Sequence, residues 1–144
     1  MGKINWTRVL IGGLIGGVVG NALWFAAWGL LIRPSLSAAL EALGRPLQET
    51  VTAAVLMVVF NFVVMILVIW LYAAIRPRYG AGPGTAALAG VAAGLLLGVF
   101  PDIGWGLTLR LIPARVWAAD AVVSLVVIVI ATLLGAWAYK EQAA

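Results

Sequence analysis

The sequence contains no cysteine and no histidine. Without cysteine the chain has no disulfide and no thiolate chemistry, and without histidine it has no imidazole metal ligand or proton relay. Because both residue types are absent, neither can ligate a haem iron, and Met57 and Met65 are the remaining candidates for axial ligands. We therefore expect no cofactor and no metal site.

Charge is also scarce, because only 10% of the 144 residues are charged while 65% are hydrophobic. An average soluble domain carries about 25% charged residues. A soluble protein of this size cannot hide so much apolar surface, since small domains leave a large share of their area exposed. The net charge of +4 does not indicate nucleic acid, because the nine Lys and Arg residues are scattered between apolar runs. Such charges orient a membrane protein.

Four long apolar runs make up most of the chain. A bilayer core about 30 Å thick requires about 20 helical residues, and open strands would leave backbone groups unsatisfied in lipid. We predict an all-α integral membrane protein, a four-transmembrane-helix bundle forming one domain over residues 1–144. The predicted spans are about 9–32, 50–75, 84–110 with a break near 101, and 116–139.

The segment after the first run predicts a short amphipathic helix in the first extracytoplasmic loop. In "PSLSAALEALGRP" the apolar face consists of Leu36, Ala39, Leu40 and Leu43, and Gly44 stands where a helix would be capped. Such a helix lies on the membrane surface. It serves either as a connector that covers the bundle or as a partner-binding helix.

Glycines recur at four-residue spacing in the first and third runs. They are Gly12, Gly16 and Gly20 in the first and Gly90, Gly94 and Gly98 in the third. Small residues at this spacing let two membrane helices approach closely, so we predict a role in helix packing. The two spans run in the same direction, which allows a parallel contact within one chain or between copies. A glycine-lined pore or cofactor slot is the alternative.

Two asparagines lie near the centres of the first and second spans. Because an unpaired amide in hydrocarbon is costly, Asn21 and Asn61 should face inward and find a partner. They either fix the register of neighbouring helices or line a path for a small ligand or ion.

Asp102 and Asp120 fall in the outer half of the membrane, where carboxylates are expensive and by default mark function. Structural roles are also open, because Asp102 could cap a helix restarting at Ile103 and Asp120 suits a helix N-terminus. Arg110 and Arg115 could reach down to pair with either aspartate. A ligand or ion path would use these four residues together with Asn21 and Asn61. No catalytic residue is expected, since two carboxylates without a histidine or nucleophile do not make an enzyme site.

Three segments, "INWTRVLIGGLIGGVVGNALWF", "WLYAAIRPRYGAGPGTA" and "ATLLGAWAYK", resemble a family of bacterial four-helix inner-membrane proteins with a domain of unknown function. The Asn-Trp pair of that family and the glycine and Trp-aromatic pair of its first helix correspond to Asn5, Trp6, Gly20, Trp24 and Phe25. The polar segment that often follows its first helix is replaced here by "AAWGLLIRPSLSAAL". The resemblance implies the bacterial inner membrane and four helices, and it implies no activity.

Four crossings place both termini and the middle loop on one side of the membrane. That side carries Lys3, Arg8, Arg76, Arg78 and Lys140, against Arg33, Arg45, Arg110 and Arg115 on the other. This excess of positive charge predicts cytoplasmic termini.

Two functions follow from these features. The first is a structural, accessory or self-associating membrane subunit, with membrane lipids and either a homo-oligomer or a larger membrane complex as partners. The alternative is a small transporter or channel for an ion or small solute that uses the intramembrane Asn and Asp residues. An enzyme that acts on lipid is the least favoured hypothesis and is not expected, and no nucleic-acid partner is expected.

Overall fold

The computed structural model describes residues 3–110 and 112–141, so residues 1–2, 111 and 142–144 of the predicted domain lie outside the described part. All regular structure in that part is helical. The elements are α1 (Trp6–Ala27), η1 (Trp28–Ile32), α2 (Arg33–Ala42), α3 (Val51–Tyr79), α4 (Pro83–Gly94), η2 (Leu95–Val99), α5 (Phe100–Leu109) and α6 (Ala114–Trp137), where η is a π-helical turn. Four long helices result, each long and apolar enough to cross a membrane. The predicted all-helical class and the four long apolar helices are confirmed.

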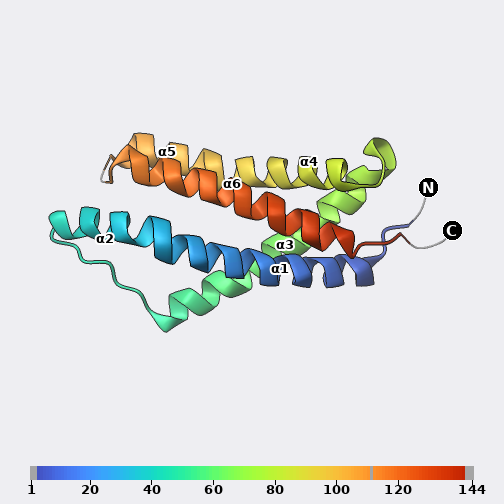
Figure 1. Cartoon of the computed structure of the whole chain (residues 1–144), viewed down its shortest axis with the longest axis horizontal. Coiled ribbons are helices and arrows are strands. Elements are labelled where there is room, and N and C mark those ends of the chain that lie inside the picture. Colours follow the sequence, from blue (N-terminus) through green and yellow to red (C-terminus); the bar gives the residue numbers. More distant parts are fainter. Residues whose placement is uncertain (1–2, 111, 142–144) are drawn as a thin grey trace.

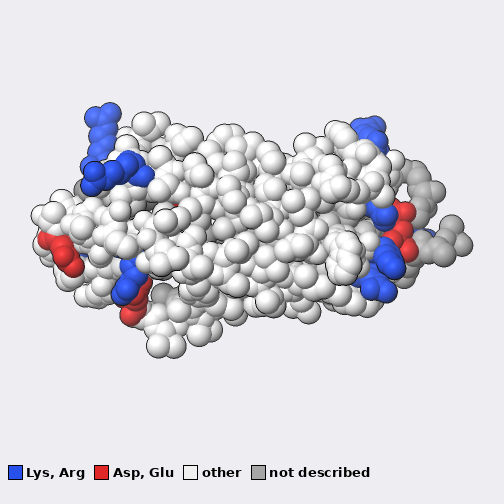
Figure 2. Space-filling model, viewed as in Figure 1, with Lys and Arg blue, Asp and Glu red and all other residues white. Residues whose placement is uncertain are grey.

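The four long helices run along the length of the molecule (Figure 1). Both described chain ends and the turn between α3 and α4 lie at one end, which we call the terminal end. The connections from α2 to α3 and from α5 to α6 lie at the other, which we call the loop end. On the face drawn in Figure 2, charged side chains gather at these two ends and an uncharged belt separates them.

Local capping explains where several helices begin and end. The side chain of Asn5 accepts a hydrogen bond from the Arg8 amide at 3.1 Å, and Thr50 Oγ1 accepts one from the Ala53 amide at 3.1 Å. Both are N-cap contacts that satisfy a free amide of the first helical turn. Pro83 occupies the first turn of α4, where its missing amide costs nothing. Helix α3 ends at Gly80, which adopts a φ of 86°.

The first helix is longer than predicted, because it continues without interruption from Trp6 to Ala42. Helix α2 extends the line of α1 (Figure 1). The π-helical turn η1 precedes Pro34, and the Arg33 amide donates to the Trp28 carbonyl across it. The helix then ends as expected at Gly44, which has a φ of 68°, and the Arg45 amide donates to the Leu40 carbonyl at 3.0 Å. The predicted helix after the first run is therefore present as α2, and it continues directly from the first helix.

The third helix has no break near residue 101. It is continuous from Pro83 to Thr108, and its irregularity is the turn η2, where the Phe100 amide donates to the Leu95 carbonyl. A proline ring clashes with the carbonyl four residues before it in a regular helix, and the widened turn directly before Pro101 relieves that clash. Asp102 accordingly lies in the first turn of α5 and makes no capping bond, so its predicted capping role was wrong.

Helix α6 is the common partner of the bundle, with α1 and α4 packed against it on different sides (Figure 1). The main core lies toward the terminal end and includes Val9, Ile69, Ala89 and Ala136. Helix α3 joins the core through its second half, whereas its first half, from Val51 onward, is largely exposed. The helices are thus closely packed near the terminal end and separate toward the loop end.

Glycines bring the helix backbones close to α6. A Cβ atom at Gly12 would lie 2.6 Å from the Gly135 carbonyl oxygen, and one at Gly94 would lie 3.2 Å from Leu125 Cα. Gly16 and Gly90 also face α6, while Gly13 and Gly17 face α3. Both glycine ridges of the first and third long helices therefore pack on α6 within the chain, and they do not meet each other.

Candidate functional site

The loop-end half of the bundle contains a pocket of about 230 Å³ to which all four long helices contribute. Most of its wall is apolar, and it includes Trp24, Phe60 and Met65. The polar side chains in the wall are Asn61, Asp102, Asp120 and Ser124. The pocket lies where α3 diverges from the other helices, so it follows directly from the separation of the helices described above.

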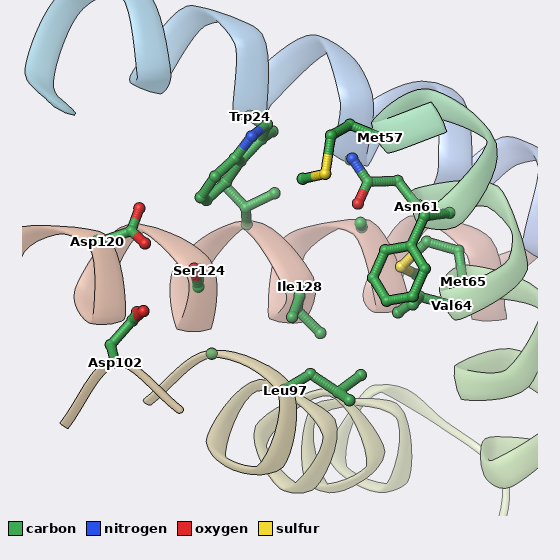
Figure 3. A pocket seen from close by; sticks show the side chains of 15 residues that line it. Trp24, Met57, Asn61, Val64, Met65, Leu97, Asp102, Asp120, Ser124 and Ile128 are labelled. Atoms are coloured by element: carbon green, nitrogen blue, oxygen red, sulfur yellow. The ribbon is translucent and has the colours of Figure 1, made fainter. Parts of the chain in front are cut away.

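Asp102 and Asp120 face each other across one end of the pocket, while Asn61 lies toward the other end (Figure 3). The two aspartates come from neighbouring helices, since α5 packs against α6. Only 8% of Asp102 is exposed. Asp102 Oδ2 and Asp120 Oδ1 are both buried and have no hydrogen-bond partner among the described residues. Buried polar groups in native proteins are nearly always paired, so these two oxygens call for a bound cation or for a proton shared by the two carboxyl groups.

The structural explanations offered for the aspartates do not hold in this geometry. Arg110 ends α5 with a φ of 48° and is exposed, and its Nε donates to the Leu107 carbonyl at 3.4 Å. Arg115 is exposed too, and the ion pairs among the described residues are Arg33–Glu49 and Arg76–Glu141. The predicted arginine–aspartate pairing was wrong, because the carboxylates point into the bundle while the two arginines stay at its surface.

The helix dipole does not account for Asp120 either. Helix α6 begins at Ala114, so Asp120 lies about two turns inside it, and the dipole effect fades within the first turn.

The two central asparagines meet, as their depth predicts. Asn61 Nδ2 donates to Asn21 Oδ1 at 3.0 Å, and Asn21 Nδ2 donates to the Gly17 carbonyl at 2.9 Å. Asn21 is buried behind this contact, and only Asn61 lines the pocket. The six residues predicted for a ligand path are therefore divided: Asn61, Asp102 and Asp120 lie in one pocket, and the other three do not line it.

Two of the predicted packing glycines help to shape the pocket. Gly20 and Gly98 line it, and a Cβ atom at Gly98 would lie 2.5 Å from Ser124 Cβ. This close approach of η2 to α6 brings the following turn, with Asp102, up to Asp120.

No family model, curated protein or solved structure matches the chain. The resemblance to the bacterial four-helix family therefore stays a prediction. Function has to be argued from the pocket alone.

Sequence reasoning missed several residues of the pocket. Ser124 follows Asp120 by four residues, so it lies on the same face of α6, and that spacing could have revealed it. Trp24, Phe60 and Leu97 carried no such signal, because an apolar residue facing a pocket looks the same in sequence as one facing lipid. Met57 and Met65 both line the pocket, but they lie about 12 Å apart along one helix and do not oppose each other as axial ligands would.

The chemistry of the pocket favours a cation with an apolar body. Two carboxyl groups at one end attract positive charge, and Trp24 and Phe60 contribute aromatic surface to the apolar wall. The described residues contain no group of three or more His, Cys, Asp or Glu side chains that could hold a metal ion. The site therefore suits an organic cation better than a tightly chelated metal.

Proposed function

We propose that the chain is an integral protein of the bacterial inner membrane that crosses the bilayer four times. The four long apolar helices and the uncharged belt between the charged ends support this. We place the terminal end in the cytoplasm, because the residues predicted on that side carry the larger share of Lys and Arg.

Within this membrane protein, we propose a small transporter that binds a small organic cation between Asp102 and Asp120. One observation carries the proposal: two buried carboxyl oxygens without partners face one apolar pocket inside the predicted spans. Acidic groups at such depth are costly and are retained where they meet a substrate or an ion. Asn61 supplies a further polar contact away from the carboxylates.

A self-associating structural subunit receives less support. Its basis was the glycine ridges, and Gly12, Gly16, Gly90 and Gly94 are already covered by α6 of the same chain. They offer no free surface to a second copy. An enzyme is not proposed, because the pocket combines its two carboxylates with no histidine or cysteine.

Charge-neutralising variants test the transporter. Asp102→Asn and Asp120→Asn should each weaken the binding of benzyltrimethylammonium at least tenfold, about 1.4 kcal/mol, because each removes one attracting charge. Calorimetry on protein in lipid nanodiscs measures binding, and uptake of the same cation into proteoliposomes measures transport.

The matched control is Glu41→Gln, which removes an exposed carboxylate outside the pocket and should change neither reading. If folded Asp102→Asn and Asp120→Asn proteins bind and transport the cation as the native chain does, the proposal is wrong.

A further inference from the structure

Three residues of the pocket wall are also exposed on the outside of the bundle. They are Met57, Phe60 and Leu97, with exposed fractions of 46%, 57% and 50%. Met57 and Phe60 belong to α3, and Leu97 belongs to η2. A residue that lines a pocket and is exposed at the surface marks an opening, so these three residues define what we call the mouth of the pocket.

The mouth lies between two helices that separate. Helix α3 packs against α4 but does not pack extensively against η2 or α5. Near the terminal end the two helices hold together, and farther along they part and leave the pocket open to the side. The opening therefore lies on the side of the bundle, between α3 and η2.

The depth of the mouth places it in hydrocarbon. Met57 and Phe60 are six and nine residues from the first residue of α3, which is about 9 Å and about 14 Å along the axis. Leu97 is eleven residues from Thr108, which is about 17 Å. Half of a hydrocarbon core is about 15 Å. In the proposed membrane orientation the mouth extends from the depth of Met57, in the outer half of the hydrocarbon, to near the bilayer midplane at Phe60 and Leu97. All three of its residues are apolar.

The carboxylates lie closer to the loop end than Phe60 and Leu97 do, at about the depth of Met57. Asp102 is six residues from Thr108 and Asp120 is six residues from Ala114, about 9 Å in both helices. Asp102 is more than nine-tenths buried, lines the pocket, and leaves Oδ2 without a partner. A ligand whose charged group sits here can extend its apolar part toward the mouth and into the bilayer.

We propose that the ligand is a membrane-partitioned amphiphilic cation that enters sideways from the lipid, between Phe60 and Leu97. This inference rests on the proposed function and specifies both the substrate class and its route. A water-soluble cation would have to cross hydrocarbon to reach the mouth. A ligand without a cationic group would leave the two carboxylates without a partner of opposite charge, which is costly at this depth.

Two cations with the same head group test the substrate class. Decyltrimethylammonium and tetramethylammonium differ only in the apolar chain, and calorimetry compares both on protein-containing nanodiscs after subtraction of empty nanodiscs. We expect the native chain to bind decyltrimethylammonium at least tenfold more tightly than tetramethylammonium.

Reversible blocking tests the route, and the chain suits it because it has no native cysteine. After modification with benzyl methanethiosulfonate, Leu97→Cys should bind decyltrimethylammonium at least tenfold more weakly. Reduction, which removes the benzylthio group, should restore the affinity. Recovery in the same sample excludes misfolding as the cause. Leu67→Cys, on an exposed position of α3 outside the pocket, should bind equally well before and after modification.

The outcomes separate this inference from the proposed function. If tetramethylammonium binds as tightly as decyltrimethylammonium, or if the modified Leu97→Cys protein binds unchanged, the lateral route is wrong while the cation site stands. If the native chain binds neither these cations nor benzyltrimethylammonium, both proposals fail.

Discussion

At the scale of single residues, Asn21 joins two helices through a small set of hydrogen bonds. It accepts from Asn61 and donates to the carbonyls of Gly17 and Val58, the last at 3.5 Å. Hydrogen bonds between membrane helices average only about 0.6 kcal/mol, because a chain unfolded in the membrane also finds partners. The asparagine contact is therefore expected to set the register of α1 against α3 more than to stabilise the bundle.

A double-mutant cycle measures this contact. Asn21→Ala, Asn61→Ala and the double variant should give a coupling free energy of about 0.6 kcal/mol and no more than about 1.7 kcal/mol. Steric-trapping measurements of unfolding in bicelles supply the four free energies. A coupling of zero would mean that the two amides do not bond, and a much larger value would contradict the weak-bond account.

The pocket shows why single residues are hard to interpret from sequence. Depth and polarity were enough to select Asn61, Asp102 and Asp120, since a polar group in an apolar run is conspicuous. The partners of Asp102 and Asp120 were not predictable, because Arg110 is close in sequence but its side chain lies outside the bundle. Only the packing of α5 on α6 shows that Asp102 faces Asp120.

At the scale of elements, the closest backbone approach joins α1 and α6. A Cβ atom at Gly135 would lie 2.5 Å from the Gly12 carbonyl oxygen, and one at Gly12 would lie 2.6 Å from the Gly135 carbonyl oxygen. Neither backbone atom can move aside as a flexible side chain would. The contact therefore depends on glycine in both helices.

Gly135→Ala should destabilise the bundle by about 1–3 kcal/mol, the usual cost of overfilling a packed contact, because α1 and α6 must move apart. Gly104→Ala is the matched control, since a Cβ atom there meets nothing within 4 Å and alanine favours the helix by up to about 1 kcal/mol. Relative to the native chain, the free energy of unfolding should fall for Gly135→Ala and should stay unchanged or rise for Gly104→Ala. Equal stability of Gly135→Ala and the native chain would contradict the close contact.

The two π-helical turns show how an element can differ from its sequence prediction. Each directly precedes a residue-proline pair, with Arg33 and Pro34 after η1 and Phe100 and Pro101 after η2. Proline indicated a break, but the extra residue in the widened turn lets the helix continue. That residue also offsets everything after it by about 100° relative to a regular helix. The direction of Asp102 consequently depends on η2.

At the scale of the whole molecule, one end is closed and the other is open. Near the terminal end Tyr72 packs edge-on against Tyr139 with ring centroids 5.9 Å apart, and Arg76 lies 5.5 Å from the centre of the Tyr139 ring. Arg76 also pairs with Glu141 at 3.3 Å. These contacts connect α3 to the segment after α6, and no comparable cluster joins α3 to η2 or α5 among the described residues. The pocket thus lies in the looser half.

Cysteine labelling tests the proposed orientation. The native chain has no cysteine and therefore serves as the unlabelled control. Ser35→Cys lies toward the loop end and Gly84→Cys near the terminal end, both at exposed positions. A membrane-impermeant maleimide should label Ser35→Cys in spheroplasts and Gly84→Cys only after permeabilisation. The reverse pattern would place the terminal end outside. Labelling of both variants in spheroplasts would contradict the single crossing by α3 that separates the two positions in the proposed topology.

The sequence by itself determined the helical class and the number of long apolar helices, because hydropathy and helix length are local properties that survive any packing. It also selected three of the four polar residues of the pocket wall, Asn61, Asp102 and Asp120. Only the tertiary structure decided that α6 is shared by both glycine ridges, that the third helix continues past Pro101, and that Asp102 meets Asp120 in a pocket whose wall includes Trp24 and Phe60. The physical reason is that these helices are apolar on every side, so their sequence does not indicate which face meets lipid, a neighbour or a pocket.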